Sequence, residues 1–374
     1  MAYYGVEPSR LGLDSTGSAG NEDLFLKVFS GEVLTTFEAN NLMMPLHRVR
    51  TIASGKSAQF PTTGVASATY HIPGDSLFAD ESIDGTNKYA SQVNHAEIVI
   101  SIDGVLTSSA FIADIDEAKN HYEVRSIYST EIGRQLAYTA DKNLLRTVIA
   151  SAQHSTDRFG TTASDTDAQI ASPYLGGEIC LIGTAADAST TNQMSIGNDV
   201  AATTGPIWVQ GIAKMAELMD SKNVPSEGRY VVLPPSEYYL LVNGENDAIN
   251  RDYNDANGSI AKGEIVSVSG VRVLKSNHVP QTNEAAASNV HNHASVVNDP
   301  FGDTGVGYGG FDFSDIVGCG FQSEGVGTVK LLDLAMESEY YMERLGTMLM
   351  ARYAMGHGAL RNECLYSFSK DITT

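Results

Sequence analysis

Cysteine is scarce in this chain, and targeting or membrane-spanning segments are not evident. The 374 residues contain three cysteines, Cys180, Cys319 and Cys364, with no C-x-x-C pair among them. This number and spacing predict neither a disulfide framework nor a zinc site, and indicate synthesis in a reducing cytoplasm. No stretch approaches the roughly 18 apolar residues of a membrane-spanning helix, and the opening MAYYGVEPSRLGLDSTGSAG is no signal peptide. We therefore expect a protein that is soluble when made and has no membrane partner.

Basic residues are also few. The chain has 24 Lys and Arg against 45 Asp and Glu, a formal net charge of −21. Binding to nucleic-acid phosphates depends on clustered Lys and Arg that release counterions. The composition therefore argues against a broad surface that grips DNA or RNA, but it permits a protein that lies beside DNA and repels it. With 42% hydrophobic residues the chain is otherwise typical of globular proteins and long enough for about two or three domains.

Two segments match phosphate-binding motifs in part of their sequence but not in structural context or spacing. Gly305, Gly307 and Gly310 have the G-x-G-x-x-G spacing, but no strand pattern precedes them and no helix pattern follows. Gly55-Lys56-Ser57 resembles the end of a phosphate-binding loop, yet Arg50 stands where the first glycine of that loop belongs. We interpret the first segment as a glycine-rich loop and the second as a hairpin turn.

Metal-binding and catalytic patterns are equally incomplete. His291 and His293 are spaced like a metal pair on a strand, but no carboxylate or cysteine pattern completes the set, so loop histidines are favoured. A calcium site is hinted at by Asp252, Asn254, Asp255 and Asn257. Ala256, however, occupies a ligand position of the EF-hand pattern, so a turn-forming loop is favoured. We therefore predict no catalytic residue, no metal ligand and no cofactor.

The longest periodic segment predicts one helix from Asp114 to Gln153. Asp114 and Glu117 form a capping pair at its start, and no proline interrupts it. The apolar stripe, at steps of three and four, comprises Ile115, Ala118, Tyr122, Ile132, Leu136, Ala140, Leu144 and Val148. Such a helix is about 50–55 Å long, so it needs a long sheet or a neighbouring subunit to cover it.

Residues 47–100 contain too little apolar bulk to form a core. Alternating stretches at both ends, RVRTIASGKSAQFPTTG and HAEIVISIDGVL, flank the acidic run GDSLFADESIDGTNK. An isolated two-stranded ribbon is marginal in water, so we expect an arm that docks on something else. The acidic run at 75–84 and the basic cluster His47, Arg48, Arg50 and Lys56 could pair between identical neighbours; an ordinary solvated surface is the equally favoured alternative.

The remaining segments are less periodic. We expect a mobile arm at 1–21, a helix beginning at Asp23, and loops over 154–204 and 281–327. An α+β unit is predicted by a helix opening at Pro206, the strand RYVVL, the helix PPSEYYLLV and a strand pair turning at Ser269–Gly270. The buried face of its first helix comprises Trp208, Ile212, Met215 and Met219. Periodicity leaves the segment from Leu334 to Ala354 open between strand and helix; we predict a strand, because the long helix needs a sheet.

Seven blocks, taken in order, resemble the major capsid proteins of short-tailed, T7-like double-stranded DNA phages. They are LFLKVFSGEVLTTFE, TIASGKSAQFP, ISIDGVL, DEAKNHYEVRSIYS, GRYVVLPPSEYYLL, VSGVRVLKSNHVP and LAMESEYYMERLGTMLMARYAMGHGALRNE. Together they extend from about residue 24 to residue 363. The first twenty residues and the loops at 154–204 and 281–310 match nothing in the family, and a marine cyanobacterium is one candidate host.

The resemblance implies an α+β chain with the HK97-like phage capsid fold. Its expected parts are an N-terminal arm (1–22), an N-terminal helix (23–46), an extended loop, here called the arm (47–100), a peripheral domain (101–155 and 334–374) and an axial domain (156–333). Within the peripheral domain, 114–153 is the spine helix. The recognisable body starts near residue 24, so assembly is expected to use a separate scaffolding protein, and no covalent cross-link carries over to Lys56.

The resemblance also implies roles for individual residues. In the arm, Phe60 and Tyr70 are expected to be apolar anchors on the adjacent subunit, and Arg50 and Lys56 to meet acidic residues there. The expected packing residues of the spine helix are Ile115, Tyr122, Ile132, Leu136, Leu144 and Val148.

The function implied is a major capsid protein, not an enzyme. Copies would assemble into hexamers and pentamers of an icosahedral shell, which the family suggests is T=7. Expected partners are other copies, a scaffolding protein, a portal protein at one vertex and packaged DNA that lies adjacent without tight binding. The location would be the virion, after synthesis in the host cytoplasm. Two alternatives stay open from sequence: an encapsulin-type nanocompartment, and a soluble enzyme with an unrecognised site in 154–310.

Overall fold

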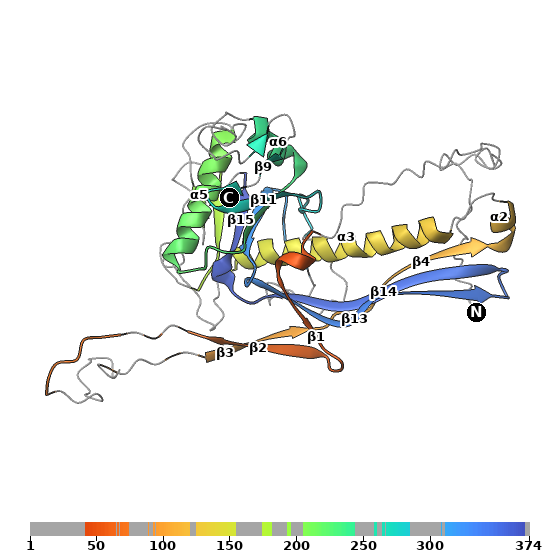
Figure 1. The fold of residues 1–374 in the computed structure, drawn as a ribbon, viewed down its shortest axis with the longest axis horizontal. Coiled ribbons are helices and arrows are strands. Elements are labelled where there is room, and N and C mark those ends of the chain that lie inside the picture. Colours follow the sequence, from red (N-terminus) through yellow and green to blue (C-terminus); the bar gives the residue numbers. More distant parts are fainter. Residues whose placement is uncertain are drawn as a thin grey trace.

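The molecule is elongated, with a long helix along a narrow sheet, an α/β unit at one end and a projecting two-stranded arm (Figure 1). The computed structural model describes residues 42–64, 66, 68–74, 89, 93, 95–119, 125–154, 174–181, 193–195, 205–243, 258–259, 264–265, 267–284, 308 and 311–370. The expected arm at 1–22 and the expected helix beginning at Asp23 therefore lie outside the described residues, except that Met44–Leu46 form the 3₁₀ helix η1.

A four-stranded sheet extends along the molecule in the order β1-β13-β14-β4. Its strands are β1 (Arg48–Thr51), β4 (Leu106–Ala113), β13 (Val326–Tyr341) and β14 (Gly346–Ala359). Strands β13 and β14 form one long antiparallel hairpin, and β4 lies antiparallel to β14. The choice of strand over helix for the C-terminal segment is confirmed, but the expected single strand from Leu334 to Ala354 is a hairpin that turns after Tyr341.

The second unit contains a seven-stranded sheet in the order β10-β11-β7-β12-β15-β5-β6. These strands are β5 (Gly177–Cys180), β6 (Gln193–Ser195), β7 (Arg229–Leu233), β10 (Ser267–Val268), β11 (Val271–Lys275), β12 (Ile316–Gln322) and β15 (Leu365–Ser369). Helices α5 (Gly205–Ser221) and α6 (Pro235–Asn243) pack on one face, where Trp208, Ile212, Met215 and Met219 are buried as predicted. Small further elements are β8 (Gly258–Ser259), β9 (Glu264–Ile265) and the 3₁₀ helix η3 (Asn362–Cys364).

The turn between β10 and β11 is the one expected from sequence. Ser269 and Gly270 have φ values of 52° and 77°, and β10 pairs antiparallel with β11. Positive φ at both central residues matches the right-handed twist of the flanking strands.

Two segments expected to be loops contribute buried strands instead. Strand β5 lies within 154–204 and strand β12 within 281–327, and every residue of both strands is buried. Strands covered on both faces show no polar alternation, and β5 has only four residues, so period-two patterning did not reveal either strand. The loop predictions at these two places were wrong.

The long helix joins the two units. The long helix is α3 (Arg125–Ala152); the predicted single helix from Asp114 to Gln153 also contains a separate short helix, α2 (Asp114–Lys119), and residues 120–124 lie outside the described part. The first half of α3 packs on the four-stranded sheet through Ile132, Leu136 and Ala140. The second half packs on the seven-stranded sheet through Leu144, Leu145, Val148 and Ile149. One stripe is therefore buried against two different sheets, and each fully buried aliphatic side chain contributes about 1.5–3 kcal/mol.

Sheet membership also differs from the expected peripheral boundary at 333/334. Residues 326–333 belong to β13 of the four-stranded sheet, whereas β15 lies between β12 and β5 of the seven-stranded sheet. After β14 the chain returns to the second unit through η3, Asn362–Cys364. The sequence of such a short strand does not indicate which sheet it joins.

Candidate assembly surfaces

The arm consists of the hairpin β2 (Ser57–Thr63) and β3 (His95–Ser101) and of an outer part that leads away from the body (Figure 1). Among the strands that the structure describes, β2 pairs with β3 alone, and the two form a two-stranded sheet. In the outer part the side chains of Tyr70 and Ile72 are 101% and 53% exposed. The outer part of the arm therefore leaves the apolar area of these two side chains at the surface.

The base of the arm, in contrast, is packed within its own subunit. Phe60 is only 8% exposed and lies in a cluster with Ile100, Val329 and Leu360. Side chains alternate between the two faces of a strand, so Ala58 and Phe60 lie on the same face of β2, the one that is buried. The structure thus places Phe60 in an intrachain core. The sequence had instead predicted that Phe60 contacts the adjacent subunit.

Arg50 also has an intrachain environment. Its guanidinium carbon lies 5.6 Å from the centroid of the Phe60 ring, and Nη1 donates a hydrogen bond to the Gln59 carbonyl oxygen at 2.8 Å. Lys56 lies in the turn before β2, where Gly55 has a φ of 117°, and its side chain is exposed. The hairpin turn predicted at Gly55 is wrong, because the flanking strands do not pair with each other: β1 pairs with β13 and β2 with β3. Of the four expected contact residues, Lys56 and Tyr70 are exposed and Phe60 is buried. Arg50 contacts Gln59 and Phe60 of its own arm.

The expected spine-helix residues fall into three groups. Ile132 and Leu136 are buried against the four-stranded sheet, and Leu144 and Val148 against the seven-stranded one. Tyr122 lies outside the described residues. Ile115 is 63% exposed, contrary to expectation. The backbone N of Asp114 donates a hydrogen bond to the Leu345 carbonyl oxygen, and Asp116, not Ile115, is buried on α2.

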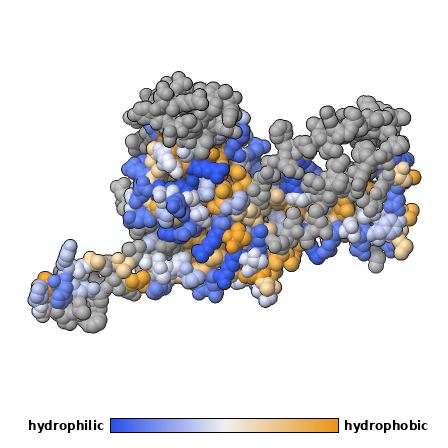
Figure 2. Space-filling model, viewed as in Figure 1, coloured by the Kyte–Doolittle hydropathy of each residue, from blue (hydrophilic) through white to orange (hydrophobic). Residues whose placement is uncertain are grey.

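An apolar patch at the hairpin tip was not found from the sequence. The tip patch is the set of exposed apolar side chains Ile115, Tyr340, Tyr341, Met342 and Leu345, with exposed fractions between 40% and 81%. The Tyr340 hydroxyl donates to Asp114 Oδ2 at 2.7 Å, which ties α2 to the hairpin. Hydrophobic residues reach the surface at this end of the molecule (Figure 2). Because the residues come from two distant segments, only the folded hairpin brings them together.

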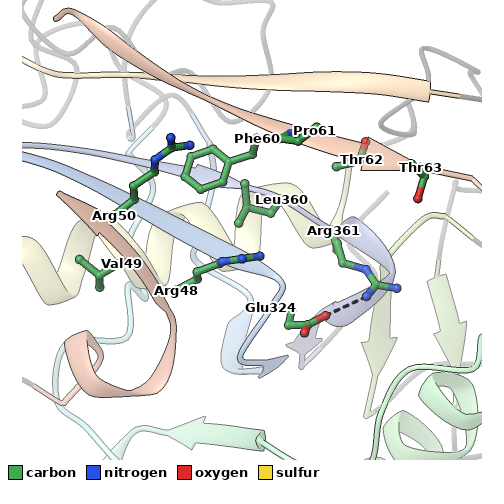
Figure 3. A pocket seen from close by; sticks show the side chains of 10 residues that line it. All are labelled: Arg48, Val49, Arg50, Phe60, Pro61, Thr62, Thr63, Glu324, Leu360 and Arg361. Atoms are coloured by element: carbon green, nitrogen blue, oxygen red, sulfur yellow. Dashed lines mark hydrogen bonds and ion pairs between the residues drawn. The ribbon is translucent and has the colours of Figure 1, made fainter. Parts of the chain in front are cut away.

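A groove of about 630 Å³ separates β1 from the arm (Figure 3). Its wall is formed by residues 48–50 of β1, residues 60–63 of β2, and Glu324, Leu360 and Arg361. Arg361 donates to Glu324 Oε2 and to Glu363 Oε1, both at 2.9 Å. Figure 3 shows three arginine side chains around this groove, Arg48, Arg50 and Arg361.

The chain entering the body is held by a buried carboxylate. Asp141 on α3 is fully buried, and its two oxygens accept hydrogen bonds from the backbone N of Leu42, at 2.8 Å, and of Met43, at 3.2 Å. A charged acceptor shared by two backbone donors is a strong anchor in a buried setting. The segment before η1 is thereby fixed to the middle of the long helix.

A second buried network joins this segment to the hairpin. His47 Nδ1 donates to the Met43 carbonyl oxygen at 2.7 Å, so in neutral His47 the Nε2 atom accepts a hydrogen bond from the Thr328 hydroxyl at 2.6 Å. Thr328 Oγ1 then accepts from His357 Nδ1 at 2.8 Å. Burial lowers the pKa of His47, and it lowers the pKa of His357 to about 3, with nearby His47 and Lys330 as smaller contributions.

The described residues contain no group of three or more His, Cys, Asp and Glu side chains placed to hold a metal ion. The glycines near 305–310, the histidines at 291 and 293 and the polar run at 252–257 lie outside the described residues. In the same described part of the chain, no helix is long and apolar enough to cross a membrane.

The fold and these surfaces define a class. A long helix along a narrow hairpin sheet, a separate α/β unit and a projecting two-stranded arm characterise phage capsid subunits with the HK97-like fold. The mature capsid subunit of bacteriophage PhiM1 has this fold, with a TM-score of 0.64 at 16% identity over 100% of this chain and 99% of that one.

The chain belongs to the Gp10A-like major capsid protein family, whose model matches residues 59–366. The chain is 32% identical over 348 residues to the major capsid protein of Escherichia phage T7, covering 91% of this chain and 90% of that protein. It is similar to the subunit in the capsid structure of the cyanophage P-SCSP1u, with 36% identity, a TM-score of 0.70, and coverage of 98% and 99% of the two chains.

The protein is thus a structural protein of a phage capsid and not an enzyme. Family membership also decides against the encapsulin alternative, because the sequence match is to phage major capsid proteins over nearly the whole chain. The T7-like resemblance and the HK97-like α+β fold inferred from sequence are confirmed.

Proposed function

We propose that copies of this chain form the hexamers and pentamers of an icosahedral shell, with the T=7 arrangement that the family suggests. The observation that carries this proposal is the arm, which projects from the body and in whose outer part Tyr70 is fully exposed. A neighbouring copy would cover it, and closed rotational contacts of this kind produce rings and shells, whereas non-closing contacts produce filaments.

Electron microscopy of the purified protein tests this proposal. We expect rings of five and six copies, or closed T=7 shells with pentamers at the five-fold vertices and hexamers between them. A particle that remains a monomer or forms open filaments under assembly conditions would contradict it. A closed shell with another triangulation number would refute only the T=7 part.

The parts of the chain can be assigned domains on this proposal. The peripheral domain would comprise the four-stranded sheet and the first half of α3, and the axial domain the seven-stranded sheet with α5 and α6. The arm, β2 to β3, would be the extended loop. Residues 365–369 would then belong to the axial domain, a proposal supported by the position of β15 in the seven-stranded sheet.

Packaged double-stranded DNA would lie against the shell without tight binding. The net charge of −21 supports this part of the proposal, because an acidic wall repels phosphate and lets DNA slide. We expect purified capsomers to show no shift of duplex DNA in gel mobility at about 150 mM salt. Tight binding that weakens steeply with salt would contradict it.

Assembly would require two further proteins, a scaffolding protein and a portal at one vertex, and would take place in the host cytoplasm before the chain becomes part of the virion. Similarity to T7-like capsid proteins over most of the chain supports this part. Expression of the chain with and without the scaffolding gene of the same phage tests it: closed shells of uniform size should depend on that gene.

A further inference from the structure

Strand β1 has one open edge beside the groove. Among the strands that the structure describes, it pairs with β13 alone. The backbone N of Ile52, the residue after β1, donates to the Lys330 carbonyl oxygen at 2.9 Å. Backbone groups of alternate residues point the same way, so those of Arg50 also face β13, and those of Val49 and Thr51 face the open edge. This edge can therefore accept an added strand.

The open edge of β2 is a poorer partner for such a strand. The Ile102 backbone N donates to the Lys56 carbonyl oxygen at 2.8 Å, so Gln59 and Pro61, three and five positions further on, point their backbone groups away from β3. Pro61 has no N–H to donate, and the Gln59 carbonyl oxygen already accepts a hydrogen bond from Arg50. An extended ligand in the groove would thus pair with β1, and β2 would form the opposite wall.

The groove is also basic, in a chain that is strongly acidic. Its lining contains Arg48, Arg50 and Arg361, and Glu324 is the carboxylate among them. Arg361 is paired with Glu324 at 2.9 Å. Arg48 has no hydrogen bond or ion pair within the described part of the chain, and the Gln59 carbonyl oxygen occupies one of the five N–H donors of Arg50. Arg48 and Arg50 are therefore the guanidinium groups left for a ligand.

The spacing of these two arginines selects a pattern. Arg48 and Arg50 lie two residues apart on one strand, so their side chains share a face about 6.6 Å apart. Both side chains extend into the groove (Figure 3). Guanidinium groups match carboxylates in shape and hydrogen-bond geometry. A strand added beside β1 presents its own alternate side chains to this face, so the complementary ligand carries two carboxylates two residues apart.

We propose that the groove binds an extended acidic segment of a separate protein, which adds as a strand to β1 and pairs its carboxylates with Arg48 and Arg50. Among the strands that the structure describes, β13 has two carboxylates at this spacing, Glu337 and Glu339. It is already paired with β14, and Glu337 is bonded to Arg352 at 2.6 Å. The inference goes beyond the proposed self-assembly, because the ligand is not a copy of this chain.

The size of the site fits a short strand. The four residues of β1 span about 13 Å at roughly 3.3 Å per residue, so four or five residues of an extended segment would lie along it. Both arginines are exposed, and ion pairs at exposed positions are screened by salt. Binding is therefore expected to weaken as the ionic strength rises.

Peptide binding tests the role of the arginines. The probe is a fluorescein-labelled heptapeptide, Gly-Val-Glu-Val-Glu-Val-Gly, and fluorescence anisotropy follows its binding to capsomers and to assembled shells. Arg48→Glu should weaken binding about tenfold or more, because it replaces an attracting charge with a repelling one. Arg48→Gln should cause a smaller loss. Arg272→Glu, an exposed change on β11, is the matched control and should bind as the unchanged chain does. Thermal unfolding of each variant separates lost binding from lost folding.

A second peptide tests the strand geometry. The isomer Gly-Val-Val-Glu-Glu-Val-Gly has the same charge and composition, but its adjacent carboxylates lie on opposite faces of an extended strand. It should bind about threefold or more weakly than the first peptide. Equal affinities would overturn the strand pairing.

Cross-linking tests the location. Thr63→Cys places a thiol in the groove lining, and mild oxidation with the first peptide carrying a terminal cysteine should add the mass of one peptide. The native cysteines are buried and should not react. Ser226→Cys, exposed before β7, is the control and should remain unmodified. Equal modification of both variants would overturn the assignment to the groove.

The remaining outcomes separate this proposal from the proposed function. Absence of peptide binding, or binding that Arg48→Glu leaves unchanged, overturns the groove site and leaves self-assembly intact. Binding to capsomers but not to shells shows that another copy covers the groove, which also overturns it. Competition by a short duplex DNA with the same dependence on Arg48 would make the groove a phosphate site instead. If the unchanged chain forms neither rings nor shells, the proposed function fails, while peptide binding to the soluble chain still decides the groove.

Discussion

The Thr328 hydroxyl lies between two buried histidines, and the Met43 carbonyl oxygen sets the direction of both of its hydrogen bonds. Because His47 Nδ1 donates to a carbonyl oxygen, Thr328 must donate to His47 and accept from His357 while His47 is neutral. The Tyr308 hydroxyl accepts from the His357 backbone N at 2.8 Å and donates to Asp103 Oδ2 at 2.5 Å. The network therefore joins the entering segment, the hairpin and the base of the arm.

This network should make the folded subunit sensitive to acid. The pKa of His357 is about 3 in the folded chain and 6.5 in the unfolded chain, so as the pH falls from 6.5 towards 3 only the unfolded chain takes up this proton. The free energy of unfolding then decreases by up to about 1.4 kcal/mol per pH unit. Above pH 6.5 His357 is neutral in both the folded and the unfolded chain, so its contribution to the free energy of unfolding no longer changes with pH.

The variant His357→Asn should be less stable at pH 7 and show a shallower loss of stability between pH 6.5 and 4. Denaturant unfolding of isolated capsomers at several pH values measures both. His95→Asn, at an exposed position of β3, is the control and should retain the slope of the unchanged chain. An identical slope in His357→Asn would refute the assignment of acid sensitivity to this site.

Gly176 sits where three backbone segments meet. A Cβ added there would lie 2.5 Å from the Leu365 carbonyl oxygen, 2.7 Å from the Asn362 carbonyl oxygen and 3.1 Å from Ala152 Cα. Backbone atoms cannot move aside as a side chain does, so Gly176→Ala should destabilise the fold by about 1–3 kcal/mol. Thermal unfolding measures the loss. Gly270→Asn, at an open turn with positive φ that Asn tolerates, should cost clearly less.

At the scale of single elements, α3 is the helix that holds the two units together. Leu144→Ala removes a side chain with 0% exposure at the seven-stranded sheet and should cost about 2–5 kcal/mol. Ile115→Ala is the matched control, since Ile115 is 63% exposed, and should change stability by about 0.5 kcal/mol or less. Denaturant unfolding compares them. Equal losses would mean that Ile115 is packed in solution, contrary to the structure.

The periodicity of this helix was readable because one stripe recurs over many turns. The sequence did not indicate what covers the stripe. Its first half packs with Leu349 and Ala351 of one sheet, and its second half with Val232 and Phe321 of the other. The arm illustrates the same division. Its alternation predicted the strands, but not that Phe60 would pack inward while Tyr70 would be exposed, because that depends on where Val329 and Leu360 lie.

At the scale of the whole molecule, the tip patch lies at the end of the long hairpin, on the elongated unit and away from the α5 and α6 region (Figure 1). Met342 and Leu345 are 81% and 66% exposed, so replacing both by Lys should leave unfolding of the subunit nearly unchanged. If neighbouring capsomers meet there, the double variant should form fewer shells but normal rings. Electron microscopy counts both species.

The control for this experiment is Glu343→Gln, which alters an exposed polar residue of the same turn. It should assemble normally. Normal shells from the double Lys variant would exclude the tip patch as a contact between capsomers.

The sequence by itself determined the family, the α+β character, the acidic balance and the position of the long helix, because each depends on composition or on short-range periodicity. The tertiary structure decided which sheet each short strand joins, which arm residues face their own body, and how Ile115 and Leu345 come to share one surface. The physical reason is that burial depends on contacts between residues far apart in the chain, and a local pattern states only that a face is apolar, not what will cover it.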